Sequence, residues 1–398
     1  MDGLGGPGYD ILEMEPQVPW QNTQTMPLEA TLASIISGDQ PLDFEQLALE
    51  VFSHQFERNL PYRTYCLRRG RTPQTVHDWR EIPAVSTASF RIVDLTCGPA
   101  ERVFLTSGTT RGPSARGRHL VPHLGLYRAA ALAHFATCVT PDGTRAPVLA
   151  LTPPPELSPE SSLVQMIEWI RETYGTGDDA YFVGQGGLDI EALCVRLRAA
   201  ARQGRPVYLI GLTAAFEELF ARCRAADQTF RLAYGTLVID TGGNKSGVRD
   251  RPAGRSLSRR GFLNACWRLL NVPGYHCVNE YGMTELCSQF YDNVLRERAA
   301  GRLTPRYKVG PPWTRTIVVD PETLEEVPSG TPGLLRHFDL ANCGSAMAVQ
   351  TDDLGVAVAD GFELRGRVDG AEPRGCALLL EHMAEANADT VVPSARNH

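Results

Sequence analysis

Apolar and polar positions follow two different periods in the middle of the chain. Between residues 100 and 280, short apolar runs rich in β-branched residues alternate with longer runs whose apolar residues recur every three or four positions. The short runs predict strands over 103–106, 147–152, 206–210, 236–240 and 275–278, and the longer ones predict helices over 160–174, 189–203, 213–224 and 257–271. Strands that alternate with helices predict an α/β body with mainly parallel sheets covered by helices.

The regions on either side of this body have other patterns. Residues 1–42 contain scattered glycines and prolines, which predicts an irregular lead-in. Asp43 is then expected to cap a helix that runs to the break at Pro61, within a body spanning 43–312. After it, β-prone segments separated by turns predict a smaller antiparallel or barrel-like part of the same domain over 313–365. Residues 366–398 are expected to form a hinge-like segment and a tail.

Charge and composition exclude several classes of protein. The first fifty residues hold nine acidic residues and no lysine or arginine, so the remainder is close to neutral and offers little attraction for nucleic acid. No apolar run approaches the roughly 20 residues of a membrane helix, and a basic signal region is missing, so we expect a cytoplasmic protein without a membrane partner. The ten cysteines lack zinc-site spacing and are expected to be reduced thiols, mostly in the core.

Three segments that follow predicted strands carry groups suited to nucleotide chemistry. The first holds the phosphate-loop candidates Thr106, Ser107, Gly108, Thr109 and Thr110, whose hydroxyls and backbone N–H groups can surround phosphate oxygens. It does not fit the ordinary P-loop pattern, and such a cluster is by itself more often a plain loop.

The other two segments follow the strands predicted over 236–240 and 275–278. Gly242 and Gly243 would let a base or phosphate approach the backbone, beside Lys245, which with Lys308 is one of only two lysines. Tyr281, Thr284 and Glu285 offer an aromatic face, a hydroxyl and a carboxylate that could hold Mg²⁺. Taken singly, the segment with Lys245 is explained about as well by a tight turn with an exposed lysine. The segment with Tyr281 is explained about as well by a surface turn.

Together the segments resemble the adenylate-forming superfamily of acyl-CoA synthetases, luciferases and peptide-synthetase adenylation domains. Asp353 lies in T-D-D-L-G, which resembles the superfamily motif T-G-D-x-G, and Arg367 lies in G-R-V-D, which resembles the hinge motif G-R-x-D. Within the superfamily, roughly residues 45–383 are most similar to LuxE-type acyl-protein synthetases, which share T-G-G-x-K, E-Y-G-M-T-E-L, D-L-A-N and R-G-C. Arg111 and Asp352 depart from the superfamily pattern, which has glycine at both places.

The resemblance implies the large N-terminal-type domain of the superfamily, ATP and Mg²⁺ as cofactors, and a role for each matched residue. Tyr281 would stack on adenine, Thr284 would contact the α-phosphate, Glu285 would bind Mg²⁺, Asp353 would hold the ribose and Arg367 would lie near ribose and phosphate. The phosphate-loop candidates would hold the β- and γ-phosphates, and Gly242 and Gly243 would lie against adenine.

Two further residues relate to what the resemblance leaves open. The chain ends about thirty residues after Arg367, so the usual C-terminal domain with its catalytic lysine is expected to be truncated. Lys245 could supply that cation, or it could be a solvated turn lysine. Cys376 stands in the R-G-C segment, where LuxE-type enzymes carry an acyl-accepting cysteine; the alternative is buried packing.

These features predict an enzyme that activates a small carboxylic acid as acyl-AMP and transfers the acyl group to a thiol, with Cys376 as the expected acceptor. A partner reductase or acyltransferase would then take the acyl group. One alternative is a ligase that passes the acyl group directly to a small amine, hydroxyl or thiol. Another is a non-catalytic nucleotide-binding subunit of a reductase complex, against which the pair Thr284 and Glu285 argues. The sequence does not identify the acid.

Overall fold

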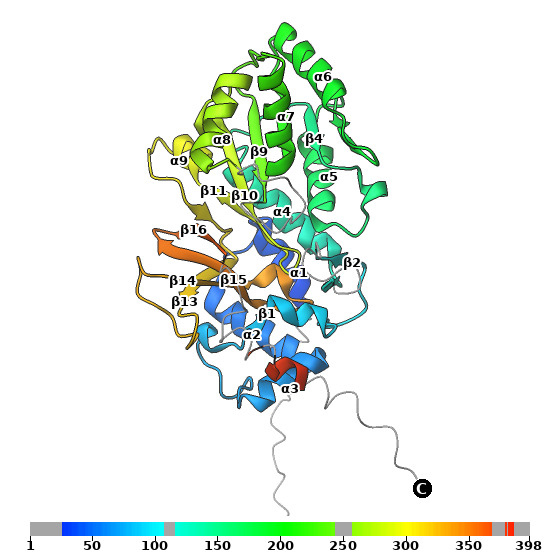
Figure 1. Cartoon of the computed structure of the whole chain (residues 1–398). Helices are drawn as coiled ribbons and strands as arrows, with labels where there is room; N and C mark the ends of the chain where they lie inside the picture. The colour runs from blue at the N-terminus through cyan, green and yellow to red at the C-terminus, as the bar shows by residue number, and fades with distance from the viewer. Residues whose placement is uncertain (1–25, 107–115, 243–256, 368–378, 380, 386–398) are drawn as a thin grey trace, which may run out of the picture.

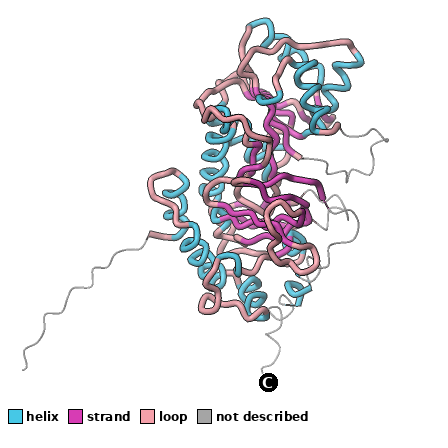
Figure 2. The backbone as a smooth tube through the Cα atoms, turned by 90° about the vertical axis from the view of Figure 1, so that its left-hand side faces the viewer, coloured by secondary structure: helices cyan, strands magenta, loops and turns pink. Residues whose placement is uncertain are grey.

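The computed structural model describes residues 26–106, 116–242, 257–367, 379 and 381–385. In these residues one long twisted sheet runs through the molecule, with helices packed along it (Figures 1 and 2). The order of its strands is β13-β14-β15-β16-β12-β11-β10-β9-β8-β4-β5, and β1 (Val85–Ser86) pairs with β15. One half of the sheet is parallel and the other antiparallel, and they meet between β10 and β11.

The parallel half confirms the predicted alternation of strands and helices. Its strands are β5 (Ala180–Tyr181), β4 (Val148–Leu151), β8 (Tyr208–Leu212), β9 (Leu237–Thr241) and β10 (Cys277–Tyr281). Its helices are α4 (Leu124–Cys138), α5 (Ser162–Tyr174), α6 (Ile190–Gln203), α7 (Thr213–Ala225) and α8 (Arg259–Ala265), the last continued by a π-helical turn (Cys266–Leu270). Strands β4 and β9 are buried at every position, as expected of strands covered on both faces.

Local signals fix the ends of these helices. The side chain of Ser161 caps α5 by accepting from the backbone N–H of Val164, and Asp189 caps α6 in the same way. Gly204 ends α6 in the left-handed conformation, at φ 63°, that favours glycine. The strand predicted over 103–106 forms as β2 (Arg102–Leu105), but it pairs with β3 (Arg118–Val121) in a separate antiparallel sheet.

The antiparallel half contains the β-rich part of the sequence. Its strands are β11 (Phe290–Asp292), β12 (Lys308–Val309), β16 (Gly361–Arg367), β15 (Ala348–Val358), β14 (Pro332–Asp339) and β13 (Thr314–Val319). Because β11 and β12 bridge β10 to β16, these strands extend the parallel sheet and do not close into a barrel within the described residues. Strands β11 and β12 were not predicted from the sequence, because they are only two or three residues long.

The N-terminal helices are α1 (Leu28–Ile36), α2 (Phe44–Arg58) and α3 (Leu60–Arg68). Asp43 caps α2 as predicted, by accepting from the backbone N–H of Gln46. This helix ends at Arg58, three residues before the break predicted at Pro61, because the side chain of the next residue, Asn59, caps α3. The irregular lead-in was wrong for residues 28–36, where α1 buries Leu32, Ile35 and Ile36; nine residues are too few to show a sustained period.

Short elements complete the described chain. They are α9 (Val294–Ala299), β6 (Val183–Gly184) and β7 (Gly187–Leu188). Near the C-terminus, Leu379 and Met383 are buried in the main core, and Glu385 forms an ion pair with Arg68 of α3 at 2.8 Å. No helix in the described ranges is long and apolar enough to cross a membrane.

Three buried histidines make the fold sensitive to acid. Burial lowers the pKa of His119 and of His134 to about 4 and that of His337 to about 3. In the unfolded chain histidine titrates near 6.5, so the unfolded state binds protons first, and stability is lost as the pH falls from about 6.5 towards the folded-state values. Over the whole range, linkage gives about 3 kcal/mol each for His119 and His134 and about 5 kcal/mol for His337. Asp339 opposes them, because burial raises its pKa to about 6 and its contribution falls as the pH rises.

We therefore expect the melting temperature to fall between about pH 7 and about pH 5, because three histidines outweigh one aspartate. Thermal denaturation followed by circular dichroism at both values measures this. His134→Gln should show a smaller drop than the wild type, since it removes one of the three histidines. A melting temperature that stays level or rises on acidification would show that these histidines do not control stability.

Candidate active site

A cavity of about 420 Å³ lies where the parallel and antiparallel halves of the sheet meet. Leu212, Thr241 and Tyr281, the last residues of β8, β9 and β10, all line it, so it lies at the carboxyl ends of parallel strands. This is the edge at which open α/β sheets bind ligands. Of the residues predicted for the site, the cavity lining contains Gly242, Tyr281, Thr284, Asp353 and Arg367.

The side chains of Tyr281, Asp353 and Arg367 form one hydrogen-bonded group. The Tyr281 hydroxyl donates to Asp353 Oδ2 at 2.9 Å, and Arg367 Nε donates to Asp353 Oδ1 at 3.1 Å. Burial raises the pKa of the Tyr281 phenol, and the neighbouring Asp353 carboxylate raises it further. Burial alone would lower the pKa of Arg367, but the Asp353 carboxylate raises it overall, so the guanidinium stays charged beside the cavity.

The ring of Tyr281 is held in place from behind by other rings. It contacts Phe290, His337 and Phe362, with ring centroids 5.5 to 5.8 Å apart. His337 Nε2 lies 3.2 Å from the Tyr281 hydroxyl, and its Nδ1 lies 2.9 Å from the Thr316 hydroxyl. The phenol is therefore fixed before any ligand arrives, which is the preorganisation a binding site needs.

The loop that carries Thr284 and Glu285 is clamped through its backbone. His119 Nδ1 donates to the Thr284 carbonyl at 2.6 Å, and its Nε2 lies 2.9 Å from Asn342 Oδ1. Asn342 Nδ2 in turn donates to the Glu285 carbonyl at 2.9 Å. Neither His119 nor Asn342 was singled out from the sequence as a site residue, although Asn342 lies in the D-L-A-N segment that marked the resemblance.

Asp339, at the start of D-L-A-N, holds the residues that follow Glu285. It accepts from the backbone N–H of Cys287 at 2.9 Å and from the Ser288 hydroxyl at 2.8 Å. The two sequence segments E-Y-G-M-T-E-L and D-L-A-N, about fifty residues apart, are thus one structural unit. Its effect is to fix the path of the chain beside the cavity.

Some predicted residues do not line the cavity. Glu285 is buried, with 8% of its surface exposed, and lies directly after the cavity-lining Thr284. Thr106 also lies outside the lining; its hydroxyl accepts from the backbone N–H of Gly117 at 2.8 Å. Seven predicted residues lie outside the described part of the chain: Ser107, Gly108, Thr109, Thr110, Gly243, Lys245 and Cys376.

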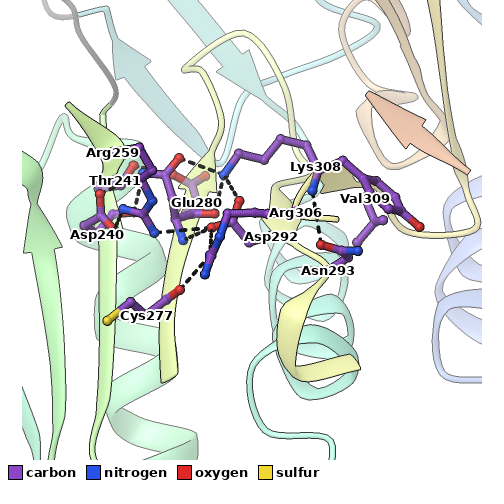
Figure 3. Close-up of polar contacts among 12 residues, drawn as sticks. Asp240, Thr241, Arg259, Cys277, Glu280, Asp292, Asn293, Arg306, Lys308 and Val309 are labelled. Atoms are coloured by element: carbon purple, nitrogen blue, oxygen red, sulfur yellow. Dashed lines mark hydrogen bonds and ion pairs between the residues drawn. The ribbon is translucent and has the colours of Figure 1, made fainter. Parts of the chain in front are cut away.

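Lys308, the other lysine, belongs to a buried ionic network (Figure 3). Its Nζ lies 2.9 Å from Asp292 Oδ1 and donates to the backbone and side-chain oxygens of Asn279. Asp292 also pairs with Arg259 and Arg306. Burial raises the Asp292 pKa, but the charges of Lys308, Arg306 and Arg259 outweigh this and hold it well below its ordinary value.

The network crosses strands β9 to β12 and ties the two halves of the sheet together. Asp240 on β9 pairs with Arg259 at 2.6 Å, and Asp292 on β11 pairs with Lys308 on β12. Removing one partner of a buried ion pair costs about 3–5 kcal/mol, because the other charge is left uncompensated. Lys308 is therefore a structural residue, and a substitution there is no neutral control for one at Lys245.

The described residues fit a nucleotide better than a metal ion alone. Gly242 has φ 77° and no atom within 3.9 Å of where a Cβ would stand, which leaves its backbone open to a flat ligand. Asp353 and Arg367 offer an acceptor and a cation suited to ribose and phosphate. Within the described ranges no three His, Cys, Asp or Glu side chains cluster as a metal site, so a metal would need phosphate oxygens as well.

This fold is that of the adenylate-forming enzymes. The structure is similar to that of 2-hydroxyisobutyryl-CoA ligase in an open conformation with 2-HIB-AMP and CoA, with a TM-score of 0.57 and 14% identity over 82% of this chain and 70% of that one. The same ligase in the postadenylation state with 2-HIB-AMP gives a TM-score of 0.58 and 13% identity over 82% of this chain and 68% of that one. At this identity the likeness concerns the fold.

The family model of LuxE acyl-protein synthetases matches residues 173–384. The chain belongs to this family and is an enzyme of the ligase class. It is 22% identical to the long-chain-fatty-acid–luciferin-component ligase of Vibrio harveyi over 360 residues, 86% of this chain and 89% of that protein. The ligase of the same name from Aliivibrio fischeri is 22% identical over 361 residues, again 86% and 89% of the two chains.

Proposed function

We propose that this enzyme uses ATP and Mg²⁺ to convert a carboxylic acid to acyl-AMP and then transfers the acyl group to its own Cys376. The observation that carries the first step is the group of Tyr281, Asp353 and Arg367 at the carboxyl ends of the strands, inside a family of acyl-protein synthetases. The names of the two luciferin-component ligases and the adenylates in the two ligase structures support the same reaction.

Each described residue is assigned a part in binding the nucleotide. Tyr281 and Gly242 border the adenine, Asp353 accepts from the ribose hydroxyls, and Arg367 lies beside ribose and phosphate. Thr284 donates to the α-phosphate, with its backbone held by His119. Thr106 begins the phosphate loop, which continues through Ser107, Gly108, Thr109 and Thr110, and Gly243 completes the wall beside adenine.

The chemistry of the first step is a displacement at phosphorus. A carboxylate oxygen of the acid attacks the α-phosphorus, and the bond from this phosphorus to the pyrophosphate oxygen breaks. Mg²⁺, when bound, neutralises phosphate charge, and Glu285 is the residue that would hold it. The protein contributes positioning and charge complementarity, which supply most of the rate in such transfers.

In the second step the thiolate of Cys376 attacks the acyl carbon and AMP leaves with the carboxylate oxygen. The thiol loses its proton to solvent before the attack, and Arg374, two residues earlier in the sequence, would favour the thiolate. A partner reductase or acyltransferase would then remove the acyl group from the thioester. In the competing view, Cys376 belongs to the apolar core and has no chemical role. The apolar run in the sequence that begins at Cys376 includes Leu379, which is buried in the core.

The experiment that tests the proposed function is a panel of carboxylic acids screened for acid-dependent release of pyrophosphate from ATP. At least one acid should raise pyrophosphate release well above the rate without acid, and omission of Mg²⁺ should remove the difference. Release of phosphate and ADP, or no response to any acid, would count against adenylation. A non-catalytic nucleotide-binding subunit would release no pyrophosphate in response to any acid.

Lys245 is proposed as a catalytic cation that contacts phosphate or carboxylate oxygens, since it lies in the glycine-rich segment that contains Gly242. Lys245→Ala should slow acid-dependent pyrophosphate release about a hundredfold, the usual size of one electrostatic group in an active site. Lys245→Arg should recover only part of the rate, because a planar guanidinium does not replace a compact ammonium. If the alanine variant keeps more than about a third of the rate, Lys245 is a solvated turn residue.

A further inference from the structure

The cavity has an apolar wall that contains none of the residues assigned to the nucleotide. Leu105 at the end of β2, Tyr127 of α4, and Leu163 and Met166 of α5 line it, and we call it the α5 wall. Leu105 and Leu163 are partly exposed, whereas Tyr127 and Met166 have only 2% and 3% of their surface accessible. Side chains from three different elements therefore border a part of the cavity that remains for the acid.

The α5 wall lies on the opposite face of the sheet from the rings that support Tyr281. Phe290 packs against Tyr281 and Phe362 on one face. The next residue of β11, Tyr291, points the other way, and its hydroxyl donates to Met166 Sδ at 4.0 Å. When the nucleotide lies against Tyr281, the acid is left with the side of the cavity that α5 forms.

Tyr127 and Met166 are the floor of the α5 wall, because a second layer of rings is packed behind them. The Tyr127 ring makes edge contacts with Phe104 and Trp169, with ring centroids 5.9 and 5.1 Å apart. Phe104, Trp169 and Tyr291 are buried, and none of them lines the cavity. Within the described ranges, this floor separates the cavity from the aromatic core behind it.

The space in front of the floor is small. The whole cavity has a volume of about 420 Å³. Pockets that enclose one drug-sized molecule have volumes of about 300–1,000 Å³, and this one has to hold the AMP part of the adenylate as well. A long acyl chain would have to push Tyr127 or Met166 into the rings behind them, and close-packed interiors resist such insertion.

We propose that the α5 wall binds the acyl chain of the substrate, and that its floor, Tyr127 and Met166, limits this enzyme to short carboxylic acids of about eight carbons or fewer. The inference rests on the proposed function and adds the substrate class to it. A methylene that fits against the apolar wall stabilises the complex, whereas one beyond the floor has to displace packed side chains. The two relatives are named for long-chain fatty acids, so this enzyme differs from them in the length of its acid.

The first arm of the test measures kcat/KM for pyrophosphate release with straight-chain acids of four, six, eight, ten and fourteen carbons. Each acid is used below its critical micelle concentration. For the wild type, kcat/KM should rise by up to about fourfold per added methylene until the chain reaches the floor. It should be highest at eight carbons or fewer, and at least about tenfold lower with tetradecanoic acid.

Two substitutions in the α5 wall should move this optimum in opposite directions. Met166→Ala shortens a side chain of the floor, so the optimum should move to acids about two carbons longer. Leu163→Phe enlarges a partly exposed side chain and should move the optimum to shorter acids; it also tests the wall if Met166→Ala does not fold. Leu197→Ala is the control. Leu197 is a fully buried residue of α6 that does not line the cavity, so this variant should melt at a lower temperature and keep the wild-type optimum.

The second arm measures binding without turnover. Non-hydrolysable analogues of the acyl-adenylate, with acyl chains of six and fourteen carbons, are titrated into the enzyme by calorimetry. The wild type should bind the six-carbon analogue at least about tenfold more tightly, because the longer chain meets the floor. Met166→Ala should reduce this difference.

The outcomes separate this inference from the proposed function. A wild type that works best with tetradecanoic acid, or equally well with acids of every length, would overturn the inference and leave adenylation standing. A short optimum that both Met166→Ala and Leu163→Phe leave unchanged would also overturn it, because the α5 wall would then not set the length. If no acid releases pyrophosphate, the proposed function fails, and tighter binding of the fourteen-carbon analogue would overturn the inference separately.

Discussion

Glu285→Gln is expected to lower Mg²⁺-dependent, acid-dependent pyrophosphate release by at least about a hundredfold. The substitution removes a charged oxygen ligand at nearly constant volume, and magnesium binds carboxylate oxygens far better than amide oxygens. Glu285 is the buried carboxylate next to the cavity-lining Thr284, and its backbone is fixed by Asn342. The measurement is the steady-state rate of pyrophosphate release with saturating acid at several Mg²⁺ concentrations.

Glu297→Gln is the matched control for this variant. Glu297 is also a buried carboxylate, but it lies on α9 and pairs with Arg296 and Arg302, away from the cavity lining. It should lose thermal stability while each folded molecule keeps its rate. If Glu285→Gln keeps a rate within about threefold of the wild type, Glu285 does not hold the metal.

Cys376→Ser is expected to abolish the covalent acyl-enzyme and leave adenylation intact for a first turnover. Adenylation precedes thiol attack and uses other residues, so the two steps can be separated by one substitution. Intact-protein mass spectrometry after incubation with ATP, Mg²⁺ and an active acid should show one added acyl group on the wild type. Neutral hydroxylamine should remove it, because thioesters are labile to that nucleophile. In the variant, acyl-AMP should accumulate instead.

The packing explanation of Cys376 makes a different prediction. Burying a serine hydroxyl in its place would cost about 1–3 kcal/mol of stability and leave the reaction unchanged. A wild type that turns over the acid without ever carrying a hydroxylamine-sensitive adduct would favour direct transfer to a small molecule. The acyl adduct on the wild type and the melting temperature of Cys376→Ser together distinguish three cases. These are Cys376 as the acyl acceptor, Cys376 as a packing residue, and direct transfer of the acyl group to a small molecule.

The parallel half of the fold could be predicted because each of its signals is local. Strand β4 is a continuous apolar stretch, β9 begins with three apolar residues, and Asp189 and Gly204 mark both ends of α6. The strands β11 and β12 carry no such signal, since two or three residues cannot show a period. They form because β10 and β16 offer edges to pair with, which is a property of the folded sheet.

The residues of the candidate site also divide into those that a local motif marks and those that only the folded structure reveals. Tyr281, Thr284, Asp353 and Arg367 were predicted from motifs, and the structure brings all four to one cavity. His119 could not be predicted, because its partners Thr284 and Asn342 lie more than 160 residues further along the chain.

Adenylation itself is tested most directly by following an oxygen atom. When the acid carries ¹⁸O in its carboxylate, attack on the α-phosphorus transfers one labelled oxygen to the nucleotide, and it stays there when the acyl group moves to a thiol. Mass spectrometry of the AMP formed should show one ¹⁸O per molecule for the wild type. Unlabelled AMP, or ADP with labelled phosphate, would contradict the formation of an acyl-adenylate.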